Sequence, residues 1–472
     1  MMHVARTTTI LVASCMAAIM VLDGCKVGPD YARPSVPTPD GWRERVRTDT
    51  SIGTEPYWRV YDDPILQGYV RQALDSNLDL VAAVARIDAA RAQITIANAD
   101  LYPQLGVDAS ASGFRNSENR YPGIGSDAFL GPSGVFGLLG TLSWELDIFG
   151  RIRRGTEAQR AQYRATEEAY RAARVSLVSA VAETYIMLRR LDLLKEIIDS
   201  NLASRRQYER LARTLFEGGK TSELDWRQAE GELRRVESEL PVVVFGIAQT
   251  ENALNVLLGR PSGMAIERGK PLTQQSFPST LPSGLPSDLL VRRPDVVAAE
   301  QRLIAANARV GQAVAAMFPR FAINATGGFQ TLDGAPVFDA NSLMWNAAGN
   351  VVQPLFQGGR LSAQVDVADA STMELVAAYR QTILQATREV NDALVEVNQR
   401  RLEVEATVGG VRSNKDVLRL SELRYRYGAT PYLQVLDAQR SLLDAQRREV
   451  EARAALYGAY INLYKALGGG WR

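Results

Sequence analysis

The sequence predicts a mostly α-helical chain with a β-barrel part, in which two copies of one unit each join a long helical hairpin to a β-hairpin. Three observations predict this fold class. Similar segments recur about 210 residues apart, which indicates an internal duplication. A stretch of strict apolar–polar alternation follows a proline in each copy, and very long stretches without proline carry apolar residues at heptad spacing.

Three pairs of segments carry the duplication. The pairs are DLYPQLGVDAS at 100–110 with AMFPRFAINAT at 316–326, FEGGKTSELDWRQAE at 216–230 with YRYGATPYLQVLDAQ at 425–439, and NALNVLLG at 252–259 with NLYKALGG at 462–469. We therefore predict a first repeat over 64–260 and a second over 289–472. A proline-rich linker over 261–288 joins them.

The N-terminus carries the signs of export. Residues 1–24 have a short basic lead, an apolar core and a small residue before Cys25, as a signal peptide does. This stretch resembles a bacterial lipobox, although Asp23 stands where that motif usually has a small residue; the resemblance implies that Cys25 receives the lipid and becomes the mature N-terminus. An ordinary cleaved signal that leaves a buried thiol is the alternative. Because Lys26 follows the cysteine, we expect sorting to the outer membrane, with an extended segment over 25–63.

Composition excludes several classes of function. His3 is the only histidine and Cys15 lies in the same signal, so the mature chain lacks the groups of a histidine-assisted hydrolase or a His/Cys zinc site. We predict no catalytic residues, no metal site and no cofactor. The 54 basic and 53 acidic residues are spread along the chain, so nucleic acid is not an expected partner. No run of 18 apolar residues follows the signal, which leaves the periplasm, or the outer membrane entered as strands.

Each repeat begins with a helix that stops at a proline and continues into two strands. In the first copy the helix runs from about Pro64 to Leu101 and stops before Pro103. The alternating strands are expected over about 104–114, 135–146, 320–331 and 342–353. This alternation is typical of outer-membrane barrels, and half-buried strands of a soluble sandwich share it. A closed barrel needs about eight strands, so four must be shared among subunits, and three subunits would supply twelve.

The remaining helices are unusually long. Residues 151–216 and 361–427 lack proline, and at 1.5 Å per residue each stretch gives roughly 100 Å of helix. Heptad spacing of the apolar residues indicates coiled-coil packing. The chain then returns over 223–258 and 432–467, so each copy is a helical hairpin with a glycine-containing tip.

The chain resembles the TolC-like outer membrane efflux proteins, closest to the lipoprotein branch that serves resistance-nodulation-division pumps. The resemblance covers essentially the whole mature chain. It rests on the start CKVGPDYARPSVPTP, the segment YWRVYDDPILQGYVRQALDSNLDL, the strand-leading LYP and MFP, and the tip RYRYGATPYLQVLDAQRSLLDAQ. It implies a homotrimer with a twelve-stranded β-barrel in outer-membrane lipid, continuous with a twelve-helix α-barrel that crosses the periplasm and closes at its periplasmic end.

The function implied by the resemblance is an exit duct for small molecules such as drugs. Its implied partners are a periplasmic adaptor and an inner-membrane resistance-nodulation-division pump. A duct for type I protein secretion is the alternative within the channel class. A periplasmic coiled-coil scaffold would share the lipid anchor and the heptads, but it has no use for four alternating strands beside the hairpin roots.

The resemblance also implies roles for single residues. Asp437 matches an aspartate that lines the pore constriction, and a second pore aspartate falls on Gln434, so one acidic ring is expected. Clustered carboxylates on a threefold axis repel one another and favour cations. A solvated helix charge is the alternative for Asp437. Asp225 and Tyr425 match positions that hold neighbouring hairpins together in the closed channel.

The hairpin tips are the expected docking sites of the adaptor. They contain Gly218, Gly219 and Thr221 in the first copy, and Gly428 and Thr430 in the second. Glycine permits tight turning and close approach of a partner, and permitting the turn alone is the alternative role. Thr430 matches a basic residue of the closed-state network, so that clasp is expected to be weaker or wired differently.

Overall fold

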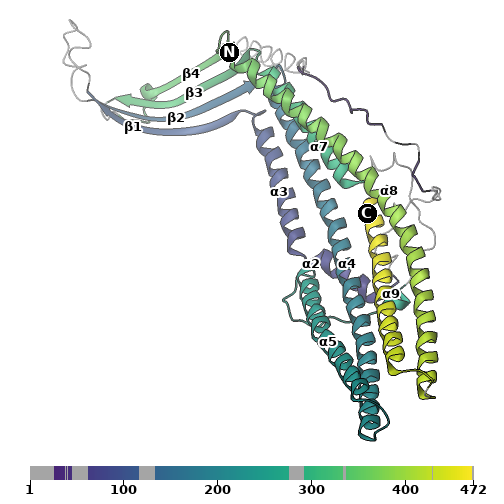
Figure 1. Ribbon diagram of the computed structural model, residues 1–472. Coiled ribbons are helices and arrows are strands. Elements are labelled where there is room, and N and C mark those ends of the chain that lie inside the picture. Colours follow the sequence, from purple (N-terminus) through teal and green to yellow (C-terminus); the bar gives the residue numbers. More distant parts are fainter. Residues whose placement is uncertain are drawn as a thin grey trace. The chain divides into compact units, whose positions relative to one another are not determined.

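The computed structural model describes residues 26–37, 39, 41–44, 62–115, 133–275, 292–332, 336–427 and 429–469. The signal at 1–24, Cys25, Gly428 and the end of the predicted linker lie outside the described residues. Helices and one antiparallel sheet make up the described chain (Figure 1). The helices are α2 (Pro64–Ser76), α3 (Leu78–Ala99), α4 (Arg151–Glu217), α5 (Glu223–Leu257), α7 (Pro294–Ala315), α8 (Arg360–Arg426) and α9 (Tyr432–Ala466).

Corresponding helices of the two repeats have equal lengths. Helices α4 and α8 both have 67 residues, α5 and α9 both have 35, and α3 and α7 both have 22. Equal lengths are what a duplicated hairpin requires. The boundaries of α4 and α8 lie within a residue or two of the stretches that lack proline in the sequence, because glycines flank both helices. Gly150 and Gly359, with positive φ, precede them, and the tip glycines follow them.

The heptad positions of α4 form its buried side. The residues that the sequence places on these positions are at most 8 % exposed: Leu177, Val181, Leu188, Leu191, Ile198 and Leu202. Several of them pack against α5 and α9, where Leu233, Val236 and Leu443 complete one cluster. Coiled-coil packing of this kind buries a narrow apolar seam and leaves the opposite side of each helix polar.

The helical stretch expected from about Pro64 to Leu101 consists of two helices, α2 and α3. Asn77 has an extended backbone (φ −68°, ψ 127°) and separates α2 from α3. Its side-chain oxygen accepts hydrogen bonds from the backbone N–H of Asp79 (2.9 Å) and Leu80 (3.2 Å), so it caps the new helix. Its side-chain nitrogen donates to the carbonyl of Leu257 at 3.0 Å. The break is stabilised by this distant contact, which the local sequence pattern does not contain.

The four strands form one sheet in the order β1-β2-β3-β4 (Figure 1). The strands are β1 (Gln104–Phe114), β2 (Ser133–Leu146), β3 (Arg320–Leu332) and β4 (Leu343–Val352), and all pairs are antiparallel. The β-hairpins of the two repeats are therefore joined edge to edge by the pairing of β2 with β3. Strands β1 and β4 each keep one edge without a partner strand in the described chain.

One face of the sheet is apolar and lies open. The register aligns Leu105 with Leu142, and Val107 with Gly140, then Gly327 and Trp345 across the sheet. Leu105, Val107, Trp345 and Val351 on this face are 62–79 % exposed. A soluble sandwich would cover such a face with a second layer, but the described residues contain no second sheet.

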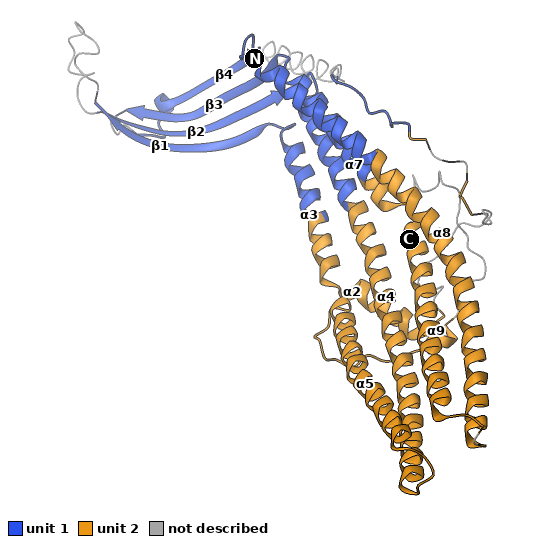
Figure 2. Ribbon diagram, viewed as in Figure 1, with its two compact units in different colours: residues 1–35, 87–166, 299–379 blue, residues 36–86, 167–298, 380–472 orange. Residues whose placement is uncertain are grey.

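The described chain divides into two compact units that cut across the repeats (Figure 2). Unit 1 takes residues Met1–Ser35, Ile87–Thr166 and Ala299–Tyr379, and it contains the sheet. Unit 2 takes Val36–Arg86, Glu167–Ala298 and Arg380–Arg472, and it contains the hairpin tips. The duplication is thus a division of the sequence and not of space, because each repeat contributes strands to one unit and coiled coil to the other.

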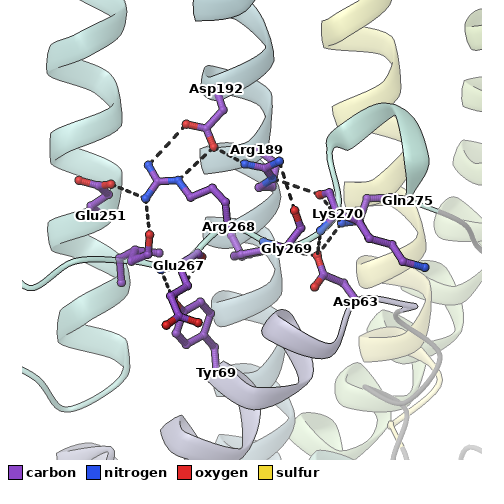
Figure 3. A network of polar contacts seen from close by, with 12 residues as sticks. Asp63, Tyr69, Arg189, Asp192, Glu251, Glu267, Arg268, Gly269, Lys270 and Gln275 are labelled. Carbon is purple, nitrogen blue, oxygen red and sulfur yellow. Dashed lines mark hydrogen bonds and ion pairs between the residues drawn. The ribbon is translucent and has the colours of Figure 1, made fainter.

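The first part of the predicted linker is anchored in unit 2 by a polar network around Asp63 (Figure 3). The buried Asp63 carboxylate caps α2 and accepts hydrogen bonds from the backbone N–H of Lys270 (3.0 Å) and the side chain of Gln275 (2.8 Å). Beside it, Arg268 pairs with both Asp192 and Glu251. Residues 261–275 are therefore an ordered part of the core's edge, held by helices from the first repeat.

One helix of the described part, α5, is long and apolar enough to cross a membrane by length and composition alone. The sequence contains no run of 18 apolar residues after the signal and therefore predicts no such helix. Core helices pass the same test, so a single example is weak evidence for a span. In this protomer only 17 % of the most apolar window is buried.

Candidate functional site

The tip of the first hairpin is closed by a glycine in the left-handed region. Gly219 has φ +70°, its N–H donates to the carbonyl of Phe216 (2.9 Å), and the N–H of Lys220 donates to that of Leu215 (2.8 Å). This pair of bonds is the Schellman pattern that ends many helices at glycine. The second tip repeats the longer bond, since the N–H of Ala429 donates to the carbonyl of Arg424 at 2.9 Å.

The other predicted tip residues differ in exposure. Gly218 is exposed and still takes part in the last turn of α4, with its N–H donating to Thr214 (3.0 Å). Thr430 is 9 % exposed, and the hydroxyl oxygens of Thr430 and Thr221 are buried without a hydrogen-bond partner in the described chain. The exposed surface of the first tip therefore includes Gly218, Gly219 and the neighbouring Leu224, which is 63 % exposed.

The predicted pore residues lie on the exposed stripe of α9. Gln434 and Asp437 are both exposed and are one helical turn apart, while Val435, Leu436 and Ala438 between and after them are buried. Residues three apart lie on the same side of a helix. The two side chains are thus presented together, on the side of α9 that this protomer does not cover.

Asp225 and Tyr425, which the sequence places on different repeats, come close together within one chain. Ser222 caps α5, and Asp225 lies in the first turn. Burial raises the pKa of the Tyr425 hydroxyl, and the negative charge of Asp225 raises it further. The Tyr425 ring also lies 5.5 Å from the ring of Tyr432, at an angle of 56°.

An aromatic group stiffens the first tip and was not foreseen from the sequence. The Trp226 ring stacks on Phe216 at 5.6 Å, and the guanidinium of Arg227 lies 4.0 Å from its centroid. The Trp226 indole N–H donates to Glu209 at 3.0 Å. Stacking on a second ring and contact with a cation each stabilise an aromatic ring beyond the burial of its surface area. The start of α5 is therefore held firmly against the end of α4.

A buried charged layer lies farther along the same hairpin. The Glu232 side chain of α5 is 1 % exposed and binds Arg235 of its own helix and Arg440 of α9. Arg205 of α4, 2 % exposed, pairs with the same carboxylate at 3.7 Å. The signal for this layer was present in the sequence: Arg205 occupies the heptad position that follows Leu191 and Ile198, where an apolar residue is expected.

The segment after Cys25 is fastened to unit 1, the unit that contains the sheet. The Arg154 side chain is 1 % exposed and donates to the carbonyls of Val27 (3.2 Å) and Gly28 (3.1 Å) and to the Asp30 carboxylate (3.0 Å). Gly28 has φ +92°, and a Cβ there would lie 2.4 Å from the Cα of Gly311. The close approach of these two glycines lets the segment lie directly on α7.

A second clasp holds the same segment a few residues later. Arg33 binds Glu300 of α7 with both branches of its guanidinium, at 2.6 and 2.7 Å, and the hydroxyl of Tyr31 donates to the same carboxylate at 3.1 Å. Burial first, and then the charge of Glu300, raise the pKa of Tyr31 well above its ordinary value. A bidentate arginine–carboxylate pair fixes both distance and orientation.

Relatives of known name share the whole length of this chain. The chain is 33 % identical over 463 residues to the solvent efflux pump outer membrane protein SrpC of Pseudomonas putida, covering 97 % of each chain. It is 34 % identical over 470 residues to the cation efflux system protein CusC of Escherichia coli, covering 98 % of this chain and 99 % of CusC.

Solved structures agree with these relatives. The open-state structure of the MtrE outer membrane channel of Neisseria gonorrhoeae superposes with a TM-score of 0.86 at 30 % identity, covering 95 % of this chain and 99 % of MtrE. A family model described as outer membrane efflux protein matches residues 69–260 and 285–469, one stretch in each predicted repeat. The chain belongs to the outer membrane efflux protein family.

Proposed function

We propose that three copies of this chain form the outer-membrane exit duct of a tripartite efflux system, through which a periplasmic adaptor and an inner-membrane resistance-nodulation-division pump discharge small molecules. Membership in the outer membrane efflux protein family supports the efflux role. The observation that carries the trimer is the four-stranded sheet with an exposed apolar face and two edges without partner strands.

Closure of the sheet among three subunits would give both unpaired edges a partner strand and would place the exposed apolar face against lipid. Backbone groups at a sheet edge need partners inside a membrane, and only a closed barrel supplies them all. Pairing β4 of one copy with β1 of the next closes twelve strands in three copies, with Leu105, Val107 and Trp345 facing lipid. The helices of the three copies then continue as a twelve-helix barrel in the periplasm.

The lipid at Cys25 belongs to the same proposal. The grip of Arg154 on residues 27–30 supports it, because this grip keeps the segment after Cys25 on the unit that contains the strands. Replacing Cys25 with Ser abolishes incorporation of labelled fatty acid, while the trimer still forms because the strands bury their own apolar band. Label that persists in the Ser variant contradicts lipidation at this residue.

The adaptor docks, in this proposal, on the two hairpin tips, of which the first contains Gly218, Gly219 and Thr221 and the second contains Gly428 and Thr430. The cargo is left to the pump. Relatives of nearly equal identity are named for solvent efflux and for cation efflux, so similarity in the duct does not select a substrate class.

The decisive experiment combines assembly, conduction and export. We expect the full-length chain, purified in detergent, to have the mass of a trimer and to conduct ions in planar bilayers. We expect cells that lack it to become sensitive to organic solvents and dyes, and to recover when it is restored. A monomer without current overturns the duct. Unchanged sensitivity, together with loss of a secreted protein, replaces small-molecule efflux with type I secretion.

A further inference from the structure

Arg205 is a buried cation whose hydrogen-bonding capacity is unused. It lies on α4 and is 2 % exposed, and none of its three guanidinium nitrogens has a hydrogen-bond partner in the described chain. Above and below it are apolar clusters shared by α4, α5 and α9, one with Leu202 and the other with Ala212. Burial lowers the pKa of Arg205, yet arginine keeps its charge in proteins. A buried charge without hydrogen bonds is unfavourable unless some arrangement of the chain gives it a partner.

The carboxylate of Glu232, which lies near Arg205, is bound by two other arginines. Arg205 Nη2 lies 3.7 Å from Glu232 Oε1, which is beyond hydrogen-bonding distance. Glu232 instead accepts from Arg235 at 2.5 Å and from Arg440 of α9 at 2.9 Å. Three arginines from three helices therefore surround one carboxylate, and the arginine of α4 is the one left without a hydrogen bond.

We propose that Glu232 exchanges partners when the duct opens: it binds Arg440 while α9 is joined to α5, and it binds Arg205 once α9 has moved away. This inference rests on the proposed function, to which it adds that α9 moves away from α5 when the duct opens. Without a receiver, departure of Arg440 would leave the buried Glu232 with only Arg235 of its own helix as a partner. Arg205 takes over the carboxylate after a shift of about 1 Å, so separation of α9 becomes less unfavourable.

A neighbouring ion pair provides a matched control. Seven residues farther along both helices, Arg447 of α9 binds Glu239 of α5, so this pair repeats the contact of Arg440 with Glu232. Because α4 is antiparallel to α5, heptad spacing places Ile198, which is 1 % exposed, opposite Glu239, as Arg205 is opposite Glu232. The Glu239 pair therefore joins the same helices without a buried arginine to receive its carboxylate.

The proposal makes the two arginines act in opposite directions. Arg440→Gln removes the partner of the joined arrangement and raises the ratio of open to closed time. Arg205→Gln removes the receiver and lowers this ratio. A merely structural role for either arginine would weaken the packing of the three helices and shift both variants in the same direction.

Single-channel recordings of full-length trimers in planar bilayers test this. We expect about a tenfold rise in the open-to-closed ratio for Arg440→Gln and about a tenfold fall for Arg205→Gln, each equivalent to about 1.4 kcal/mol. The effect of Arg205→Gln disappears in the Arg440→Gln and Glu232→Gln backgrounds, since no exchange remains. It persists beside Arg447→Gln, because Arg447 binds Glu239 and not Glu232, and among the described residues the two carboxylates are linked only through Arg235 of α5. A rise or no change in the Arg205→Gln variant overturns the exchange.

Two further measurements keep the test decisive. Arg205→Lys keeps the charge and lowers the ratio less than Arg205→Gln, so it tests the exchange even where the Gln variant fails to assemble. Spin labels at exposed Arg234→Cys on α5 and Ser441→Cys on α9 report the separation of the two helices without any current. A wild-type trimer that conducts no ions contradicts the proposed duct, whereas label distances unaffected by Arg205→Gln contradict the exchange.

Discussion

The hydroxyl of Tyr185 donates a hydrogen bond of 2.9 Å to the carboxylate of Asp63, 122 positions earlier in the chain. The same hydroxyl accepts from the backbone N–H of Gly269 at 2.8 Å. Burial raises the pKa of Tyr185 well above its ordinary value, and the charge of Asp63 adds to the rise, so the hydroxyl stays protonated as a donor. Tyr185 thus joins the start of α2 to the segment after α5.

Removing Asp63 should therefore detach that segment. Asp63→Ala leaves several buried donors without an acceptor and removes the cap of α2, so we expect a loss of about 3 kcal/mol in the free energy of unfolding. Gly269→Ala acts at the same place, since a Cβ there would lie 2.1 Å from Asp63 Oδ1. Thermal unfolding measures the loss of stability in both variants.

Asp62→Ala and Gly68→Ala are the controls. Asp62→Ala removes an ion pair whose carboxylate is 63 % exposed, and a Cβ added at Gly68 would enter open space. A loss of unfolding free energy in these controls equal to that of Asp63→Ala contradicts the role of the network.

Arg154 should decide whether the N-terminal segment stays on unit 1. Arg154→Met removes the donors to Val27, Gly28 and Asp30, and loss of about 1.4 kcal/mol of anchoring makes the freed segment about tenfold more populated. Limited trypsin digestion then cuts after Lys26 correspondingly faster. Arg160→Met, at an exposed position of the same helix, is the control. Equal cutting in wild type and Arg154→Met shows that other contacts hold the segment.

Replacing Gly219 with Asn tests whether this glycine only permits the turn of the chain or also leaves room for the adaptor to dock. Gly219→Ala costs about 1 kcal/mol because φ is +70°, whereas Asn tolerates this conformation and preserves the turn. No atom lies within 4 Å of the position of an added Cβ, so the Asn side chain extends into open space at the tip. We expect intact Gly219→Asn trimers with reduced efflux and reduced adaptor crosslinking. Full efflux by this variant returns Gly219 to a purely conformational role.

An acidic ring that selects ions and a contact that keeps the channel closed should respond differently to mutation. If three copies of Asp437 form the acidic ring, Asp437→Ala weakens block by divalent or polyamine cations and raises conductance in planar bilayers. Asp225→Ala and Tyr425→Phe loosen the closed state with less effect on block, because these residues join α5 to the end of α8. Asp416→Ala, which removes a 63 % exposed carboxylate on α8, is the control for general charge effects. Block that is unchanged in Asp437→Ala restores the interpretation as a solvated charge.

The buried Glu232 predicts a pH dependence of stability. Burial raises the pKa of Glu232, but hydrogen bonds from Arg235 and Arg440 outweigh it and hold the pKa below the ordinary value of 4.5. A carboxylate whose pKa is lower in the folded chain than in the unfolded chain stabilises the fold at pH values above its unfolded pKa. This stabilisation is lost as the pH falls through the folded pKa, which lies below 4.5. Glu232→Gln therefore costs about 3 kcal/mol at neutral pH, and the cost shrinks as the pH falls toward about 3.

Thermal melts of the two proteins across this pH range measure the difference. Glu223→Gln is the matched control, because its side chain is 58 % exposed and such surface pairs contribute about 1 kcal/mol or less. A cost for Glu232→Gln that stays constant down to acid pH contradicts the ionised pair.

The candidate functional site could be predicted only in part from the sequence. The sequence placed Gly219 in a turn and Asp437 on a helix, and resemblance to the family suggested their roles. It did not indicate that Thr430 is buried or that Trp226 stacks on Phe216. These facts depend on which helix faces which, and a heptad pattern gives a helix its apolar side without naming the partner.

The sequence by itself determined the elements and their repetition. Long stretches without proline, bounded by glycine tips, specify the 67-residue helices, and alternation with a period of two specifies the strands, because both signals are local. The tertiary structure alone decided the break at Asn77, the pairing of β2 with β3, and the meeting of Arg440 with Glu232 across 208 positions. Such contacts are chosen by the free energy of burying and pairing groups far apart in the chain, and no short window of sequence contains both partners.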